Sequence, residues 1–299
     1  MIRLAVRVRR EQAELVLAEL LELAPAGVEE AQVGEETVEY AVYGAPGELP
    51  RLPDLRAAAG EALVELSTSE LPDDWSERWK RFHRPVLIDA PRPRGARDRP
   101  VPALRVRPPW EAASGLGGGE LREIVIDPGQ AFGTGGHAST RLCLELLLEL
   151  AAQRRARGPL LDVGTGSGVL AIAAARLGFA PVLALDHERQ SVQAARANAV
   201  ANGVQIEVRR FDLRTQALPW LDAGSPPPGA PVVTANLLRP LLVELARTMD
   251  AAPAHLLAGG LLREELDGVA RAFRDGAGLR ERERRASGEW AALWLSAET

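Results

Sequence analysis

Three glycines at alternate positions follow a short apolar run in the segment LLDVGTGSGVLAIAAARLG, residues 160–178. The apolar run ends at Asp162, and Gly164, Gly166 and Gly168 precede a helix-like stretch. Glycine has no side chain to block a ligand, so the backbone can approach one closely here. Main-chain N–H groups at a helix start can then bind a carboxylate or a phosphate. We call residues 164–168 the glycine loop and predict a ligand-binding turn; a generic tight turn is the alternative.

The glycine spacing and a later acidic residue indicate which ligand this is. Asp186 ends the next apolar run, VLALD, where nucleotide-binding folds place a carboxylate that binds the ribose hydroxyls. Dinucleotide enzymes favour G-x-G-x-x-G, whereas the spacing here, G-x-G-x-G, is typical of methyltransferases that bind S-adenosylmethionine. Phe211 and Asp212, after a third apolar run, are predicted to lie at the edge of the adenine. The alternatives are a helix cap for Asp186 and a core position for Phe211.

A third polar segment, DPGQAFGTGGHAST at residues 127–140, comes directly before an apolar helical stretch. We call it the signature segment. Its Ser139 or Thr140 could do no more than cap that helix. Its length, and its position just before the run that leads into the glycine loop, instead favour a part in lining the binding site.

Composition excludes several other classes of protein. A net charge of −5 argues against broad binding to nucleic acid, so no direct recognition of a nucleic-acid sequence is expected. The histidines and the single cysteine have no metal-ligand spacing, so no metal site is predicted. No stretch has the roughly 18 uncharged apolar residues of a membrane span. The start of the chain lacks the pattern of a secretory signal, so a cytoplasmic location with no membrane partner is expected.

The elements that must position these residues alternate between strand and helix from residue 159 onward. Five short apolar runs, PLLDVG, VLALD, IEVRR, PVVTAN and HLLAG, are separated by helical stretches. This order predicts an α/β fold, a Rossmann-like domain at residues 110–299 with a mostly parallel sheet and helices on both faces. Two further runs at 280–296 predict an antiparallel hairpin at the sheet edge.

The first 70 residues have a different pattern. Strand-like alternation and helix-like spacing follow one another in the order β-α-β-β-α-β, with expected elements at residues 2–8, 10–23, 28–34, 37–44, 52–63 and 64–71. This is the order of a small α+β ferredoxin-like domain, residues 1–70. Between the two domains, residues 71–109 contain a helix-like stretch and then a Pro/Arg-rich segment, which predicts a stiff linker or an edge segment.

The signature segment resembles the D-P-G-x-A-F-G-T-G-T-H-x-T-T motif of the bacterial PrmA-type enzymes, which methylate large-subunit ribosomal protein number eleven. Further blocks resemble the same family: DVGTGSGVLAIAA, ANLLRPLLVELA, LLAGGLL and GEWAALWL. The resemblance covers most of residues 72–299, and the family also has a substrate-recognition domain where we predict the ferredoxin-like domain. The chain is therefore expected to use S-adenosylmethionine to methylate lysines, and an N-terminal α-amine, of a ribosomal protein.

The resemblance also implies a set of site residues. Thr140, Gly164, Asp186 and Asn236 would contact S-adenosylmethionine, and Phe132, Gly133 and Thr134 would line the site. With Asp162, Gly166 and Asp212 from the patterns above, these make up the predicted cofactor site. The signature segment departs from the family at three positions: Gly136 replaces a Thr, Ala138 a Pro and Ser139 a Thr. A hydroxyl that the family has at position 136 is therefore missing.

Methyl transfer to an amine needs a neutral nucleophile. A free lysine of pKa about 10.4 is only about 1 part in 2,500 neutral at pH 7, but an apolar pocket beside a sulfonium lowers that pKa. No dedicated base is then required, and positioning supplies most of the rate. Asn236, at the end of PVVTAN, is the predicted catalytic residue, because its side-chain carbonyl can accept a hydrogen bond from the amine. A plain turn residue at Asn236 and a general base at His137 are the alternatives.

Other functions are also compatible with parts of the pattern. A methyltransferase of another protein, such as an electron-transfer flavoprotein subunit, would share the catalytic domain, but the N-terminal domain favours the ribosomal protein. A non-catalytic module with a cofactor fold is disfavoured by the intact Asn236 and signature segment. An NAD-dependent oxidoreductase is disfavoured by the glycine spacing.

Overall fold

A computed structural model describes residues 2–23, 28–34, 36–44, 49–70, 83–89, 103–114, 121–128, 133–153, 158–221 and 231–297. The chain divides into two compact units, residues 1–82 and 83–299, which we describe separately. Among the described residues, no helix is both long and apolar enough to cross a membrane.

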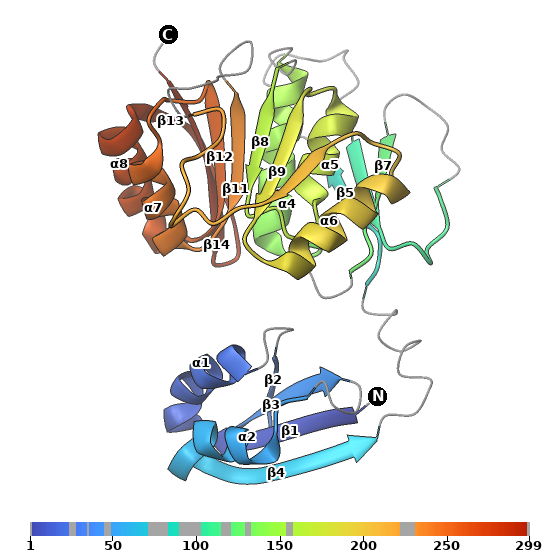
Figure 1. Ribbon diagram of the computed structural model, residues 1–299, viewed down its shortest axis with the longest axis vertical. Helices are drawn as coiled ribbons and strands as arrows, with labels where there is room; N and C mark the ends of the chain where they lie inside the picture. The colour runs from blue at the N-terminus through green and yellow to red at the C-terminus, as the bar shows by residue number, and fades with distance from the viewer. Residues whose placement is uncertain are drawn as a thin grey trace. The chain divides into compact units, whose positions relative to one another are not determined.

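The first unit is a four-stranded antiparallel sheet with two helices (Figure 1). Its elements are β1 (Ile2–Arg9), α1 (Ala13–Leu23), β2 (Glu29–Gln32), β3 (Thr37–Gly44), α2 (Leu52–Ala59) and β4 (Leu63–Glu70), with short 3-10 turns at Arg10–Gln12 and Gly60–Ala62. The strand order is β2-β3-β1-β4. Alternate residues of β1 such as Leu4 and Val6 are buried with Leu20 and Leu55 of the helices. The predicted β-α-β-β-α-β order is confirmed.

The second unit begins with a small three-stranded sheet, made of β5 (Val86–Asp89), β6 (Ala103–Arg107) and β7 (Leu121–Val125). β5 pairs with β6 in antiparallel fashion, and β6 pairs with β7 in parallel fashion. Two of these strands lie within the predicted linker at 71–109, so the described parts of that segment belong to a sheet. Ile88, Leu104 and Val106 of these two strands are buried in the core of the second unit, so the strands are part of its fold and not a solvated linker. The helix predicted just after residue 71 lies outside the described residues.

The main sheet has seven strands in the order β10-β9-β8-β11-β12-β14-β13. They are β8 (Leu160–Val163), β9 (Val182–Asp186), β10 (Glu207–Arg210), β11 (Val232–Asn236), β12 (His255–Leu262), β13 (Leu279–Ser287) and β14 (Trp290–Ala297). The first five strands in that order run parallel, and β14 runs antiparallel to both of its neighbours. The mostly parallel sheet with an antiparallel hairpin at one edge is therefore confirmed.

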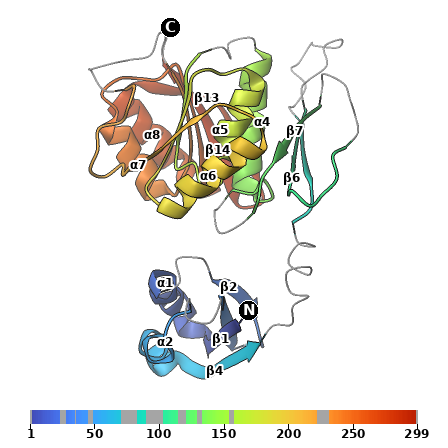
Figure 2. The same cartoon turned by 45° about the vertical axis from the view of Figure 1, so that its right-hand side comes forward.

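Helices cover both faces of this sheet (Figures 1 and 2). One face packs against α4 (Ala138–Ala152), α5 (Val169–Leu177) and α6 (Arg189–Ala201), and the other against α7 (Arg239–Thr248) and α8 (Leu266–Ala277), which follows a 3-10 turn at Arg263–Glu265. Neighbouring strand residues alternate between the two cores, as Leu160 and Leu161 do. β9 and β11 lie on opposite sides of β8, so the order in which the chain adds strands to the sheet reverses at β8. A crevice is expected at the carboxyl ends of the parallel strands where this reversal occurs.

Candidate active site

The glycine loop follows β8 directly and leads into α5. All three of its glycines have positive φ, +74° at Gly164, +54° at Gly166 and +87° at Gly168. A side chain at Gly164 would also place its Cβ 2.3 Å from Leu237, and one at Gly168 would lie 3.1 Å from the Ala195 backbone of α6. Glycine is therefore required here both by conformation and by close packing.

Asp162 stabilises this loop through a hydrogen bond with Thr165. Its carboxylate is fully buried and accepts hydrogen bonds of 2.6 Å from the hydroxyls of Thr165 and Thr234. Burial raises the pKa of Asp162 to about 6, although the two hydroxyls act in the opposite direction. The structure thus places Asp162 among residues that shape the loop, not among those that line a cavity.

Asp186, at the end of β9, faces the glycine loop. One carboxylate oxygen accepts a hydrogen bond from the Gly166 N–H at 2.9 Å, and the other accepts one from the Glu188 N–H at 3.0 Å. Each carboxylate oxygen can accept a second bond. Asp186 also lines both cavities described next. The N-cap residue of α6 is Glu188, so Asp186 binds the backbone just ahead of the helix and is not its cap.

A cavity of about 450 Å³ lies at the predicted crevice, next to a smaller one of about 120 Å³. Both are lined by Gly164, Asp186, His187, Leu237 and Leu241, so they form one continuous crevice. The larger part also contains four of the predicted residues, Gly133, Thr140, Gly166 and Asn236. The smaller part contains the predicted adenine neighbours Phe211 and Asp212.

Besides Asp162, two predicted residues are not placed in this crevice. Phe132 lies outside the described residues, and Thr134 is half-buried without lining either cavity. A larger hollow of about 660 Å³ lies between α8 and β13. It contains none of the predicted residues, and its Arg284 is paired with Asp267 and Glu281. We therefore place the site in the crevice.

The signature segment enters the crevice through the start of α4. The helix is capped by His137, whose Nδ1 accepts a hydrogen bond from the Ser139 N–H at 3.3 Å, so Ser139 and Thr140 are not the cap. The His137 ring also meets Trp290 edge to face at 4.6 Å. Burial lowers the pKa of His137, and the charge of Arg141 lowers it further. With Nδ1 engaged as an acceptor, His137 stabilises the segment and is poorly suited to act as a base.

Asn236, at the end of β11, brings an unusual polar atom into the crevice. Its Nδ2 donates a hydrogen bond to the Thr140 hydroxyl at 3.2 Å. Its Oδ1 is buried and has no hydrogen-bond partner among the described residues. Buried acceptors are normally paired, so an unpaired one in a cavity wall is suited to a ligand donor. Gly259 makes room for it, because a Cβ there would lie 3.1 Å from Oδ1.

Sequence reasoning did not assign several residues of the crevice wall. Trp290, from the hairpin strand β14, lines the larger cavity together with Leu238 and Gly260. Gly260 has φ +78°, and a Cβ there would lie 2.6 Å from the Leu237 carbonyl oxygen. A glycine pair inside an otherwise apolar strand is a usual sign of such close approach, and this signal was present in the run HLLAGGLL.

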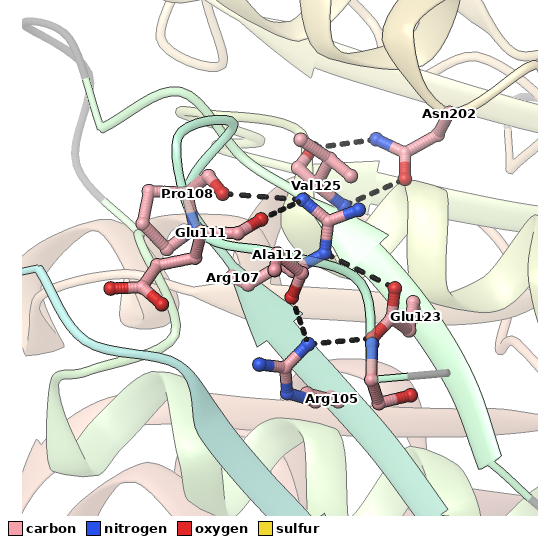
Figure 3. A network of polar contacts seen from close by, with 9 residues as sticks. Arg105, Arg107, Pro108, Glu111, Ala112, Glu123, Val125 and Asn202 are labelled. Atoms are coloured by element: carbon pink, nitrogen blue, oxygen red, sulfur yellow. Dashed lines mark hydrogen bonds and ion pairs between the residues drawn. The ribbon is translucent and has the colours of Figure 1, made fainter. Parts of the chain in front are cut away.

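The small sheet of β5, β6 and β7 also contacts the signature segment. Glu123 of β7 binds Arg105 at 2.6 Å and Arg107 at 3.1 Å (Figure 3). Burial alone would raise the pKa of Glu123, but hydrogen bonds from the Ser114 N–H and both guanidinium groups hold it at about 2. β6 then contacts the segment, because a Cβ at Gly135 would lie 3.0 Å from Val106.

No group of three or more His, Cys, Asp or Glu residues in the described part of the chain could hold a metal ion. The crevice instead combines a glycine loop, a strand-end carboxylate and an unpaired amide oxygen. That combination suits a nucleotide-like ligand and a hydrogen-bond donor that meet in one cavity.

Comparison with known proteins identifies the family of the chain. The family model for ribosomal protein L11 methyltransferase (PrmA) matches residues 55–298. The chain is 32% identical over 281 residues to a ribosomal protein L11 methyltransferase of Sorangium cellulosum, which covers 89% of this chain and 81% of that protein. It is 37% identical over 248 residues to one of Geobacter sulfurreducens, covering 81% and 73%.

A solved structure gives the same result. The crystal structure of ribosomal protein L11 methylase from Lactobacillus delbrueckii subsp. bulgaricus is 28% identical, with a TM-score of 0.53, and the match covers 66% of this chain and 95% of that one. The extent of the family match, residues 55–298, includes the signature segment, the glycine loop, Asp186 and Asn236. The chain is a methyltransferase that belongs to the ribosomal protein L11 methyltransferase family.

Proposed function

We propose that this chain transfers methyl groups from S-adenosylmethionine to amino groups of ribosomal protein L11, on lysine side chains and on the N-terminal α-amine. The observation that carries this proposal is the crevice itself. It joins the glycine loop and Asp186, which suit the cofactor, to the unpaired Oδ1 of Asn236, which suits an amine. The names of the related proteins supply the identity of the substrate.

The residues of the crevice fit S-adenosylmethionine along its length. Main-chain N–H groups of the glycine loop suit the carboxylate of its amino-acid end. Asp186 has acceptor capacity left for the ribose hydroxyls. The smaller cavity, edged by Phe211 and Asp212, suits the adenine. When bound, the cofactor supplies an electrophilic methyl group on a sulfonium.

The other end of the crevice favours the neutral form of the substrate amine and orients it. Leu237, Leu238 and Trp290 give this wall an apolar character, which disfavours the charged form of an entering lysine. Asn236 Oδ1 then accepts a hydrogen bond from the neutral amine and directs its lone pair away from the amide. Thr140 fixes the Asn236 side chain through its hydroxyl, so that the oxygen and not the nitrogen is free. His137 needs to take no proton in this scheme.

We further propose that residues 1–70 recognise the protein substrate and that residues 110–299 carry catalysis, with residues 71–109 between them. The first unit has its own core, which includes Leu4, Tyr40 and Leu55, and is compact by itself. The sequence of residues 1–70 contains no glycine-rich segment like the glycine loop. A partner-binding role fits these features better than a catalytic one. We place the enzyme in the cytoplasm, with no direct recognition of nucleic-acid sequence.

Mass spectrometry of ribosomal proteins tests the proposal. The purified chain is incubated with isotope-labelled S-adenosylmethionine and with ribosomal proteins from cells that lack this enzyme. We expect the label on L11, at lysines or at the N-terminal amine. Label on a different protein, with none on L11, would show that the substrate is wrong while the chemistry is right. No label on any protein would argue against methyl transfer to proteins altogether.

A further inference from the structure

A chain of hydrogen bonds connects the signature segment to the glycine loop through α6. Asn198 of α6 is buried, and both the oxygen and the nitrogen of its side-chain amide form hydrogen bonds. Its Oδ1 accepts a hydrogen bond from the Asp127 N–H at 3.0 Å, and its Nδ2 donates one to the Ser167 carbonyl at 2.8 Å. The amide of Asn198 thus ties the first residue of the signature segment to the glycine loop.

Ser167 completes the connection. It is fully buried, and its hydroxyl donates a hydrogen bond of 2.6 Å to the carbonyl of Gly133. Gly133 has φ +98°, and a Cβ there would lie 3.3 Å from the Ser167 hydroxyl oxygen, so the Gly133 backbone packs closely against the Ser167 side chain. Asp127, Asn198, Ser167 and Gly133 therefore form one relay, which anchors the signature segment at two points.

A second asparagine of the same region fixes the strand that leads into the segment. Asn202, the residue after α6, accepts a hydrogen bond from the Val125 N–H at 2.8 Å and donates one to the Val125 carbonyl at 2.6 Å (Figure 3). Its amide therefore bonds to both backbone groups of Val125, as a neighbouring strand would. Asn202 is buried and also donates a hydrogen bond to the Asn198 main-chain carbonyl at 2.8 Å, so this bond connects the two asparagines directly.

We infer that Ser167 and Asn198 are positioning residues for methyl transfer. The inference rests on the proposed function, in which the glycine loop holds the cofactor and Gly133, His137 and Thr140 line the part that receives the amine. The distance between the two reacting groups then depends on how these two backbone segments are fixed to each other. Small misplacements of reacting groups lower rates by large factors. Neither side chain lines the crevice, so both act through the segments they join.

Kinetic comparison of Ser167→Ala with the parent enzyme tests this. The variant loses the hydroxyl that binds the Gly133 carbonyl and retains the backbone of the glycine loop. We expect its kcat to fall by about tenfold to a hundredfold. The dissociation constant for S-adenosylmethionine, measured by calorimetry, should change by less than about threefold, because the cofactor contacts remain. Ser296→Ala, which removes a buried hydroxyl from β14 far along the chain from the glycine loop, is the control and should leave both values unchanged.

A second variant addresses the other half of the relay. Asn198→Asp retains an acceptor for the Asp127 N–H but removes the donor to the Ser167 carbonyl. It should show the same pattern, a lower kcat with little loss of cofactor affinity. Equal losses of kcat and cofactor affinity in both variants would overturn the inference, since these residues would then act only on the cofactor loop. An unchanged kcat in both would overturn it as well.

Hydrogen exchange gives a readout that needs no protein substrate. In the parent enzyme, adding S-adenosylhomocysteine should slow amide exchange in residues 133–140 as well as in the glycine loop. In Ser167→Ala the glycine loop should still be protected, whereas the protection of 133–140 should be lost. Equal protection of both segments in parent and variant would refute the relay. An inactive parent enzyme with the expected exchange pattern would refute the substrate assignment and leave the relay intact.

Discussion

Asn236 donates its Nδ2–H to the Thr140 hydroxyl, and this bond determines which atom of the amide is left for a ligand. The remaining Oδ1 can only accept hydrogen bonds, and it is buried without a partner among the described residues. An acceptor of this kind suits an amine, which brings N–H donors, and does not suit a carboxylate or a carbonyl. The Thr140–Asn236 pair therefore presents an acceptor that suits a nucleophile carrying hydrogen, and this is the role that we propose for it.

Asn236→Ala should lower kcat far more than it weakens cofactor affinity, because the proposed partner of Oδ1 is the attacking amine. Thr140→Val should have a smaller effect in the same direction, since it frees the amide to rotate. Thr248→Val is a matched control in α7, where the hydroxyl bonds only to carbonyls of its own helix. Steady-state kinetics with calorimetry of cofactor binding gives both values. A large loss of cofactor affinity with normal kcat at saturation would contradict the assigned role.

Asp186→Ala should weaken binding of S-adenosylmethionine by about 1.5–3 kcal/mol, the usual contribution of hydrogen bonds to a charged acceptor. Asp186→Asn should lie between the variant and the parent, because it retains one acceptor oxygen near the Gly166 N–H. Isothermal titration of the purified chains measures the difference. Tight binding of NAD by the parent, or an unchanged affinity in Asp186→Ala, would show that the crevice holds a different ligand.

His137→Ala should retain most of the activity at saturating cofactor. The pKa of His137 is lowered by burial and by Arg141, so the ring is neutral at pH 7 and its Nδ1 is already an acceptor. The rate should instead rise with pH as more of the substrate lysine becomes neutral. A pH–rate profile of parent and variant checks this. A folded, cofactor-bound His137→Ala enzyme with no activity would establish His137 as a base.

Asp162 should make the protein less stable as the pH rises toward neutral. Its folded pKa of about 6 is above its ordinary value of 3.8, so its contribution is fully present below about pH 4 and is lost as the pH rises through 6. A difference of about two pKa units corresponds to roughly 3 kcal/mol. Relative to the parent, Asp162→Asn should therefore gain up to about 3 kcal/mol of unfolding free energy between pH 4 and pH 7. Urea titrations across this range test it, and a constant difference would contradict the prediction.

A chain that begins at Leu71 should fold and bind S-adenosylmethionine. Both cores of the second unit are built from residues beyond Val86, and all the crevice residues lie beyond residue 130. It should lose methylation of L11, because a second binding site that raises the local substrate concentration is gone. Methyl incorporation at equal cofactor occupancy compares the two chains. Equal incorporation would mean that residues 1–70 are not the recognition domain.

The glycine loop, Asp186 and Asn236 could be predicted because each stands at the end of a short apolar run. In a parallel sheet, such ends converge at one edge, so strand order alone brings these residues together. Asp162 also stands near the end of such a run, yet its side chain is buried beneath the glycine loop and lines neither cavity. Its carboxylate accepts a hydrogen bond from Thr234, which lies on a strand distant in sequence, and no local pattern predicts that neighbour.

Ser167, Asn198 and Trp290 could not be assigned for a related reason. Asn198 occupies a regular position on a helix, and its bonds to Asp127 and Ser167 appear only when three segments meet. The strands β5 and β6 were hidden by composition, because prolines and arginines surround two short alternating runs. Periodicity over four or five residues is too short to outweigh such flanks.

The contact of Trp290 with His137 also has a consequence for synthesis. The chain is made from its N-terminus, and domains fold as they emerge. Trp290 opens β14, which lies between β12 and β13, so β13 can join the sheet only after β14 has been made. Until then the crevice lacks one wall and the cap of α4 lacks its aromatic neighbour. The crevice of this chain is therefore complete only after Trp290 has been synthesised and β14 has joined the sheet.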